Sequence, residues 1–531
     1  MPDNQPDSAS TPVSYSRQQR VGVIRIDNPP VNAVSQAVRR GLLEALERAE
    51  GDSDVEVIVL LATGRTFIAG ADIREFGKPP QPPLLPEVIA TLEACDKPLI
   101  AVLHGTALGG GLEVALGCHL RVVLEGAKVG LPEVKLGLLP GAGGTQRLPR
   151  LAGVECALDM ITSGRFVAAE EAQRLGIVDA VMTGNDPLSV GLAAAERLLQ
   201  GRYVPRVSGD LPVPTADPEA CERYRKRLAE EVPYLFSPFR IVDAVEAATR
   251  LPFAEGLRRE RELFTECMES SQRAGLIHTF FASRGTHKVP GAGSDSSLTT
   301  LGLVGHHALF EALATNAAKA GVRLIDLDAE IGDGIQACLI APDVDASRRQ
   351  ALRSILPIGT PRIDVAIPPD FSSDACDAAL VLSPLDAALP ICELVDYTNN
   401  PALIQALANT LKKLKRQVVV TRHGSVIAAL EKALSDAIAD DHEASRLSTA
   451  WEAEGWDLSP WLAKVNDRVE LDDTDAEHHR RPLDLAWQQA AQTLSANGQV
   501  HRDSDIDVLA TQAFGYPSHL GGPAFRSSVS R

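Results

Sequence analysis

The stretch that decides the fold runs from His104 to Arg150 and reads HGTALGGGLEVALGCHLRVVLEGAKVGLPEVKLGLLPGAGGTQRLPR. It begins within a predicted strand and turn over 98–105, after which three consecutive glycines, 109–111, open an apolar segment. Glycine lets a backbone N–H approach a ligand closely, and the N-terminus of a helix favours negative charge. The stretch therefore predicts an anion-stabilising turn, with Glu113 in the first turn of the helix that follows.

A second glutamate, Glu133, lies twenty residues beyond Glu113. It follows a predicted strand over 120–124 and the pair Leu131-Pro132, so its surroundings are largely apolar. A carboxylate in apolar surroundings has a raised pKa and can give or take a proton near neutral pH. Two carboxylates in unlike surroundings can divide the roles of acid and base.

A second source of backbone donors is the small-residue segment 66–73, which follows a predicted strand over 57–61. Two backbone N–H groups that converge on one oxygen are what an enolate-forming reaction on a thioester needs. The glycine-rich run 141–145 lacks the lysine of a phosphate-binding loop, so it is interpreted as a turn that opens a helix.

Three motifs, GTALGGGLEVALGC, LPEVKLGLLPGAGGTQRLPR and FIAGADIREF, resemble the crotonase (enoyl-CoA hydratase/isomerase) superfamily over about residues 15–205. The resemblance implies an α/β protein with a crotonase-like ββα spiral core. In the hydratases of this family, the first glutamate helps to activate the water that attacks Cβ, and the second exchanges the proton at Cα. Carried over by position, the site residues are the catalytic Glu113 and Glu133, the oxyanion-hole residues Ala71 and Gly110, and the CoA-contacting Ala69, Asp72 and Ile73.

The two glutamates favour hydration, because addition of water to a conjugated thioester is helped by two carboxylates whereas isomerisation can work with one. The expected reaction is reversible syn hydration of a trans-2-enoyl-CoA to a 3-hydroxyacyl-CoA, with an acyl-CoA as substrate and without a metal or redox cofactor. Three alternatives stay open: a double-bond isomerase of 3-enoyl-CoA, a true bifunctional hydratase/dehydrogenase, and a non-catalytic C-terminal module that docks a thiolase or dehydrogenase partner.

Beyond the core over 16–205, the sequence predicts a helical extension over 206–283 and a linker over 284–297. A strand, helix and strand then follow over 298–325 and end in Asp326, which is the βαβ plan of a dinucleotide-binding fold. This arrangement resembles the multifunctional enzymes of fatty-acid oxidation, which join a crotonase half to a 3-hydroxyacyl-CoA dehydrogenase half. The resemblance implies a Rossmann-like domain over 298–412 and a helical C-terminal domain over 413–531.

The dehydrogenase half is predicted to be degenerate. Of the three fingerprint glycines only Gly305 is present, followed by His306-His307-Ala308-Leu309-Phe310, although Asp326 remains at the ribose position. By resemblance, the family's histidine and asparagine positions hold Leu380 and Ala428, while Glu393 matches the histidine-orienting glutamate if one insertion is allowed. The sequence therefore predicts no NAD binding.

Composition limits the partners. The formal net charge of −18 argues against nucleic acid and anionic membrane surfaces, and no apolar run is long enough for membrane insertion. The eight cysteines form no CxxC pair and fit a reducing cytoplasm, which is the predicted location. Adjacent histidine pairs at 306–307 and 478–479 lack zinc-motif spacing, so no metal site is predicted. Residues 1–15 are predicted to be disordered, and the oligomeric state is left open.

Overall fold

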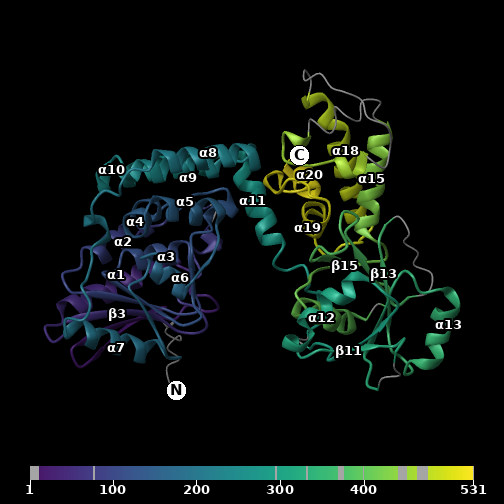
Figure 1. Cartoon of the computed structure of the whole chain (residues 1–531), viewed down its shortest axis with the longest axis horizontal. Coiled ribbons are helices and arrows are strands. Elements are labelled where there is room, and N and C mark those ends of the chain that lie inside the picture. Colours follow the sequence, from purple (N-terminus) through teal and green to yellow (C-terminus); the bar gives the residue numbers. More distant parts are fainter. Residues whose placement is uncertain are drawn as a thin grey trace, which may run out of the picture. The chain divides into compact units, whose positions relative to one another are not determined.

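The computed structural model forms two compact units, unit 1 over Met1–Arg273 and unit 2 over Ala274–Arg531 (Figure 1). The structure describes residues 11–75, 78–293, 296–329, 333–368, 376–398, 400–440, 451–462 and 476–529. Each unit has its own sheet and its own hydrophobic core, which is the usual organisation of a chain of this length.

Unit 1 is built on a six-stranded sheet in the order β1-β2-β3-β4-β6-β9. Only the β1–β2 pair is antiparallel, so most of the sheet is parallel. Its strands are β1 Val13–Gln18, β2 Val21–Ile26, β3 Val57–Ala62, β4 Leu99–Leu103, β6 Leu120–Leu124 and β9 Ala180–Met182. A second, three-stranded sheet consists of β5 Thr106–Leu108, β7 Lys128–Gly130 and β8 Val167–Ala168.

Among the described helices of unit 1, six lie between strands in the chain and four come after the last strand. They are α1 Gln36–Gly51, α2 Leu85–Glu93, α3 Gly110–Leu116, α4 Gly144–Ala152, α5 Val154–Ser163, α6 Ala169–Arg174, α7 Pro187–Leu199, α8 Pro218–Glu231, α9 Ser237–Ala248 and α10 Phe253–Glu269. Short 3-10 helices are η1 Ile73–Glu75, η2 Glu133–Leu136 and η3 Ser208–Asp210. Helix α11, Ser271–Ala282, crosses the boundary between the units.

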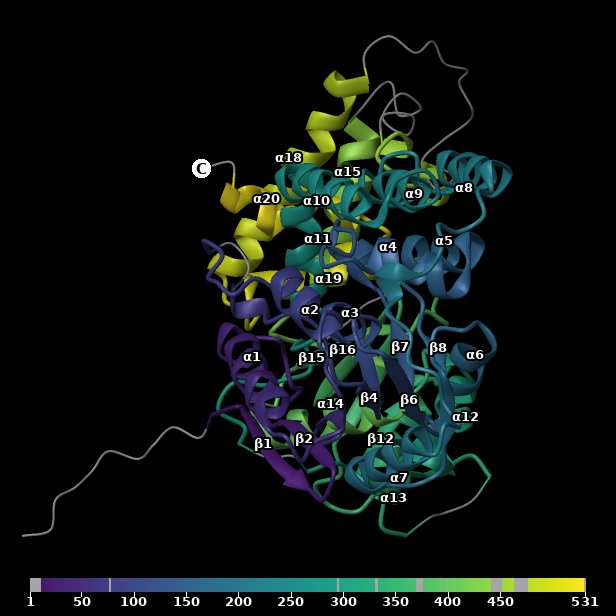
Figure 2. The ribbon, with the colours of Figure 1, turned by 90° about the vertical axis from the view of Figure 1, so that its left-hand side faces the viewer.

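Both faces of the larger sheet are covered, which explains why β3 and β4 consist entirely of buried apolar residues. Helix α7 packs on β3, β4 and β6, while α1 packs on β1 and β2. Helices α8, α9 and α10 form a further row over α4 and α5 (Figure 2). Because α10 contacts α4, the helical extension packs directly on the segment that carries the glycine-rich run.

Unit 2 contains a seven-stranded sheet in the order β11-β10-β12-β13-β14-β15-β16. Its pairs are parallel except β14–β15. The strands are β10 Thr300–Val304, β11 Arg323–Asp326, β12 Ala337–Ile340, β13 Arg362–Ala366, β14 Ala378–Leu382, β15 Ile391–Asp396 and β16 Gln417–Arg422. The first crossover places β11 beside β10 through a helix, as the βαβ plan predicted.

The described helices of unit 2 are α12 Ala308–Ala320, α13 Ala346–Ile355, α14 Pro401–Lys413, α15 Val426–Asp440, α17 Ser459–Leu462, α18 Ala476–Ala496, α19 Asp503–Ala513, η4 Ser518–Leu520 and α20 Pro523–Val529. Helices α15, α18, α19 and α20 pack together at one end of the sheet (Figure 1). All four tryptophans of the chain are buried in their core, so unit 2 holds every tryptophan that the protein has.

The predicted architecture is confirmed as mixed α/β with a helical C-terminal region. Two boundaries differ. The predicted disorder through residue 15 is wrong at its end, because β1 begins at Val13 and pairs with β2. The Rossmann-like sheet runs through β16, so the predicted end of that domain at residue 412 falls before its last strand. Residues 1–10 and the side chains of His478 and His479 lie outside the described residues.

Candidate active site

Glu113 lies in the first turn of α3, as predicted, and its side chain is buried. Its Oε1 accepts hydrogen bonds from the backbone N–H groups of Ala142 at 2.8 Å and Gly144 at 2.9 Å. Burial raises the pKa of this carboxyl, whereas the two backbone N–H groups and the positive charge of Arg147 act to lower it. Both hydrogen bonds reach Oε1, so the turn at 142–144 sets the direction in which the other carboxylate oxygen, Oε2, points.

Glu133 is the first residue of η2 and lies beside the glycine turn that precedes α3. Its Oε2 is buried and has no hydrogen-bond partner among the described residues. Burial, together with the negative charges of Glu113 and Glu260, raises the pKa of Glu133 well above its usual range. The two glutamates therefore have unlike surroundings, one held by two N–H groups and the other with an oxygen left unpaired.

The two predicted oxyanion residues, Ala71 and Gly110, come together from separate segments. A Cβ placed on Gly110 would lie 3.8 Å from the backbone nitrogen of Ala71. Gly109 has a φ of +54° and allows the Glu133 carboxylate to approach, since a Cβ there would lie 3.0 Å from Glu133 Oε1. The turn at 109–110 therefore lies directly beside both the Ala71 N–H group and the Glu133 carboxylate.

The predicted CoA-contacting residues lie on both sides of Ala71 in the chain, Ala69 before it and Asp72 and Ile73 after it. Ala69 donates its backbone N–H to Val31 O at 3.2 Å, and Ile73 begins η1. The Asp72 carboxylate is bound by the guanidinium of Arg74, with Nη2 to Oδ2 at 2.6 Å, which lowers its pKa. Pairing with Arg74 offsets a negative charge that would otherwise repel an anionic ligand.

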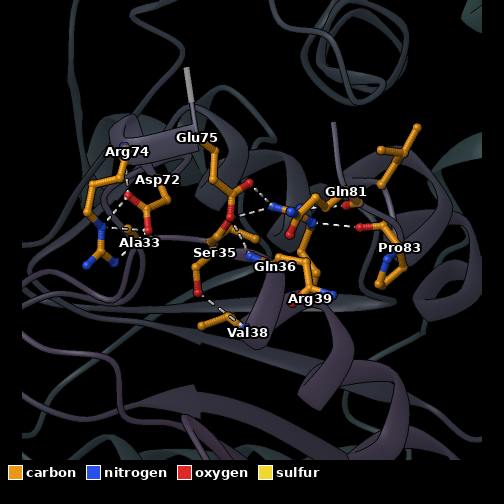
Figure 3. Close-up of polar contacts among 12 residues, drawn as sticks. Ala33, Ser35, Gln36, Val38, Arg39, Asp72, Arg74, Glu75, Gln81 and Pro83 are labelled. Atoms are coloured by element: carbon orange, nitrogen blue, oxygen red, sulfur yellow. Dashed lines mark hydrogen bonds and ion pairs between the residues drawn. The ribbon is translucent and has the colours of Figure 1, made fainter. Parts of the chain in front are cut away.

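A buried arginine, Arg39, fixes the far side of this loop (Figure 3). Its guanidinium donates to the carbonyl oxygens of Pro83 at 2.7 Å and Gln81 at 3.0 Å, and to Glu75 Oε2 at 2.9 Å. Glu75 in turn accepts the backbone N–H of Gln36 at the start of α1. This network ties η1, the 81–83 segment and α1 together, so the loop that carries Ala71 is anchored by side chains that were not predicted.

Sequence reasoning also missed Glu260, a buried carboxylate on α10. Its Oε1 accepts the N–H of Gly143 at 2.6 Å, and its Oε2 accepts the N–H of Thr145 at 3.0 Å and the Thr145 hydroxyl at 2.5 Å. Burial and the charge of Glu113 raise the pKa of Glu260 to about 8. One signal was available, because Gly256, Glu260, Leu263 and Cys267 form a helical stripe of buried residues in which a glutamate is out of place.

A buried ion pair also contacts the turn at 142–145. Arg147 of α4 meets Glu93 of α2 through two hydrogen bonds, Nε to Oε1 at 3.0 Å and Nη2 to Oε2 at 2.6 Å. Arg147 Nη1 also donates to Ala142 O at 3.1 Å, and Glu93 Oε1 accepts the N–H of Gly209 at 2.9 Å. Each guanidinium nitrogen of Arg147 therefore makes a hydrogen bond, and the side chain is only 2% exposed.

In unit 2, the turn that would face a dinucleotide is occupied by acidic side chains. The N–H of Gly305 donates to Asp328 Oδ2 at 2.7 Å, and the N–H of His306 lies 3.2 Å from Asp343 Oδ2. His307 accepts the N–H of Leu309 and caps α12. A diphosphate bound at this turn would need these backbone N–H groups, which donate to two carboxylates in this structure.

The three positions that were matched to dehydrogenase catalytic residues lie in strands and helices of unit 2. Leu380 is buried in β14, and Ala428 lies in α15. Glu393 is completely buried and accepts four hydrogen bonds, from the hydroxyls of Thr421 and Ser425 and from the N–H groups of Val426 and Ile427. It therefore caps the N-terminus of α15, a role that the sequence comparison with the dehydrogenase did not predict.

The geometry of unit 1 can be compared with known proteins. The family model described as enoyl-CoA hydratase/isomerase matches residues 16–206, which contain both site glutamates and the two amide-bearing segments. The chain belongs to the enoyl-CoA hydratase/isomerase family. An enoyl-CoA hydratase subunit I from Geobacillus kaustophilus is 32% identical over 52% of this chain and 97% of its own, with a TM-score of 0.33. The assignment to the enoyl-CoA hydratase/isomerase family rests on the sequence matches.

Similarity to longer relatives extends beyond the enoyl-CoA hydratase/isomerase segment. A peroxisomal bifunctional enzyme of Danio rerio is 34% identical over 73% of this chain and 58% of the relative. The peroxisomal bifunctional enzyme of Homo sapiens is 38% identical over 60% of this chain and 45% of the relative. The chain thus spans about half the length of the curated relatives it matches.

Three further observations concern the described residues only. No helix among them is long and apolar enough to cross a membrane. No three His, Cys, Asp or Glu side chains in these ranges are grouped so that they could hold a metal ion. An open hollow of about 500 Å³ lies between β9 and α7, lined by residues such as Asp186 and Arg197, and it includes none of the predicted site residues.

Proposed function

We propose that unit 1 catalyses the reversible syn addition of water to a trans-2-enoyl-CoA, giving a 3-hydroxyacyl-CoA. The observation that carries the proposal is the pair Glu113 and Glu133, which interact electrostatically beside the turn where Ala71 and Gly110 meet. Membership of the enoyl-CoA hydratase/isomerase family and the names of the bifunctional relatives support the same substrate class.

In this proposal the thioester oxygen accepts the backbone N–H groups of Ala71 and Gly110. These donors stabilise the negative charge that develops on that oxygen when the Cα–Cβ double bond is attacked. The loop residues Ala69, Asp72 and Ile73 contact the CoA moiety, mainly through backbone atoms. Backbone donors suit an anionic ligand because a protein with a formal charge of −18 offers it no general attraction.

The two glutamates divide the proton transfers. Glu113, held by two N–H groups, acts as the ionised base that accepts a proton from water while the water oxygen bonds to Cβ. Glu133, whose raised pKa favours the protonated form, delivers its proton to Cα. The sum is addition of one water molecule, and the site is reset when Glu113 loses its proton to solvent and Glu133 takes one up. No metal or redox cofactor takes part.

The test is loss of the enoyl-thioester absorbance when the purified chain meets crotonyl-CoA or a long-chain enoyl-CoA. We expect rapid loss with wild type and a fall of about 10²–10⁴-fold in kcat for Glu133→Gln, the usual contribution of a general acid. Glu125→Gln is the matched control, because Glu125 is exposed and should behave as wild type.

A folded wild-type protein that consumes neither substrate would refute the hydratase proposal. The isomerase alternative makes a different prediction, since isomerisation of a 3-enoyl-CoA should survive Glu113→Gln better than hydration does. A protein that isomerises 3-enoyl-CoA but never adds water would therefore assign the site to isomerisation.

We further propose that unit 2 binds no NAD and has no dehydrogenase activity. The support is that Asp328 and Asp343 accept the N–H groups of the former phosphate turn, and that leucine and alanine replace the family's histidine and asparagine. Unit 2 would then serve as a docking surface for a thiolase or dehydrogenase. Co-purification of the chain without a second enzyme would count against that role.

The compartment is a separate prediction. The cysteines favour a reducing interior such as the cytoplasm, whereas both animal relatives carry peroxisomal names. We propose the cytoplasm on the cysteine argument. Fractionation of cells that express the full chain distinguishes the two locations, and recovery with peroxisomes would overturn the proposal.

A further inference from the structure

The N-terminus of α4 is shared between two carboxylates that arrive from different helices. The four successive backbone N–H groups of Ala142, Gly143, Gly144 and Thr145 donate alternately to Glu113, Glu260, Glu113 and Glu260. N–H groups at the start of a helix have no partner within the helix and lie at the positive end of its dipole. They are therefore suited to hold two negative groups at once.

We propose that Glu260 is a positioning residue for hydration: it holds the N–H groups of Gly143 and Thr145, and so fixes the turn whose alternate N–H groups hold the Glu113 carboxylate. The inference rests on the proposed hydratase function. It assigns a role to a residue on α10, outside the segment 16–206 that matches the family model.

The contacts of Glu260 hold the turn firmly, and we call this set of hydrogen bonds the clamp. Glu260 is only 2% exposed, and both of its oxygens are used, with Oε2 also bound by the Thr145 hydroxyl. The turn is crowded on the same side, because a Cβ on Gly141 would lie 2.6 Å from the Phe264 ring of α10. Any shift of α10 would therefore move the turn, and with it Glu113.

The consequence for catalysis follows from where Glu113 is held. Its Oε1 accepts the N–H groups of Ala142 and Gly144, so these two bonds fix the direction in which Oε2 points. A base must lie within hydrogen-bond reach of the proton it removes, and a displacement of about 1 Å can lower a rate by about 100-fold. Loss of the Glu260 contacts should therefore reduce turnover more than substrate binding.

Glu260 also acts through its charge in the alkaline part of the pH profile, where a carboxyl with a pKa of about 8 is ionised. Its negative charge contributes to the raised pKa of Glu133, which is the proton donor in the proposed reaction. Removing that charge should let Glu133 lose its proton at a lower pH. The alkaline limb of the hydration profile should then move to lower pH, an effect that a residue important only for stability would not produce.

The experiment compares Glu260→Gln, Glu260→Asp and Glu262→Gln with wild type in crotonyl-CoA hydration across pH. For Glu260→Gln we expect kcat to fall about 10- to 100-fold with KM changed less than about threefold, and the alkaline limb to move to lower pH. Glu260→Asp keeps the negative charge but has a shorter side chain that cannot reach the turn. Its kcat should therefore fall while the alkaline limb of the pH profile stays in place. Glu262 is exposed on the same helix, and its variant should match wild type.

Hydrogen exchange of the amides at 142–145 provides a readout that needs no substrate. Glu260→Gln should accelerate exchange at Ala142 and Gly144 as well as at the two amides that Glu260 binds directly. Wild-type kcat, pH profile and exchange in this variant would overturn the positioning role while the hydratase proposal stands. An inactive wild type would overturn the hydratase proposal, and unchanged exchange in the variant would then separately overturn the clamp.

Discussion

Replacing Arg147 with methionine should destabilise unit 1 strongly, because it leaves a buried carboxylate without its partner. Arg147 makes two hydrogen bonds to Glu93 and one to Ala142 O, and its guanidinium lies 5.0 Å from the centre of the Phe253 ring. Breaking a buried pair by removing one partner costs about 3–5 kcal/mol. With an m-value of about 3 kcal/mol per molar, the urea midpoint should fall by about 1–1.7 M.

The assay is urea unfolding followed by far-ultraviolet circular dichroism, which reports on both units. All four tryptophans lie in unit 2, so their fluorescence follows that unit alone and identifies which transition has moved. The matched control is Arg259→Met, which removes a partly exposed pair with Glu262 and should cost about 0–1 kcal/mol.

The double variant Glu93→Met/Arg147→Met tests whether the unpaired charge causes the loss of stability. Replacing both partners with apolar side chains of similar volume removes the unpaired charge, so most of the lost stability should return. A remaining cost of about 1–3 kcal/mol is expected, because Ala142 O and the N–H of Gly209 lose their partners. A single variant within about 0.5 kcal/mol of wild type, or a double variant as unstable as the sum of the two, would refute the account.

The same substitution makes a prediction about pH. The positive charge of Arg147 acts against the burial that raises the pKa of Glu113. Without Arg147 that pKa should rise further, so Glu113 would ionise at higher pH. Because the proposed base must be ionised, the acid limb of the hydration profile should move to higher pH in Arg147→Met, and a limb that moves to lower pH would contradict the assignment.

Two further predictions concern the turn of unit 1 and the dehydrogenase-like unit. A Cβ on Gly144 would lie 2.9 Å from Glu113 Oε1, so Gly144→Ala should slow hydration about 10- to 100-fold. The control is Gly51→Ala, because a Cβ there would have no atom within 4 Å and hydration should not slow. Equal rates for the two variants would show that Glu113 tolerates displacement. NADH at about 1 mM should show no change in fluorescence with the full chain, because Asp328 and Asp343 occupy the phosphate turn; saturable binding would refute that interpretation.

Local signals predicted much of the fold. The strand at 120–124 has the predicted bounds, and α12 lies inside the predicted strand, helix and strand over 298–325, since both are apolar runs ended by glycine or polar residues. The first βαβ crossover of unit 2 was also predicted, because strand, glycine turn, helix and strand follow one another without interruption. Boundaries set by long-range pairing were harder, and β16 joined its sheet beyond the predicted limit because its place depends on β15.

The candidate site divides in the same way. Glu113 and Glu133 could be named because each is placed by its own short motif. Glu260 could not, because it lies 115 residues from Thr145 in the sequence and meets it only when α10 packs on α4. Glu393 was matched to a dehydrogenase position, and only the structure shows that its carboxylate caps α15.

The glycines of the run 141–145 are explained by the three side chains that approach it. A Cβ on Gly143 would lie 1.8 Å from Arg147 Nη1, one on Gly144 would lie 2.9 Å from Glu113 Oε1, and one on Gly141 would meet Phe264. Interpreting the run only as a helix-opening turn accounts for one of these, since Gly143 has a φ of +99°. The others are needed because a cation, a carboxylate and an aromatic ring all contact this backbone. The run is therefore the point where α3, α4 and α10 meet, and its sequence reflects the packing of a helix more than a hundred residues away.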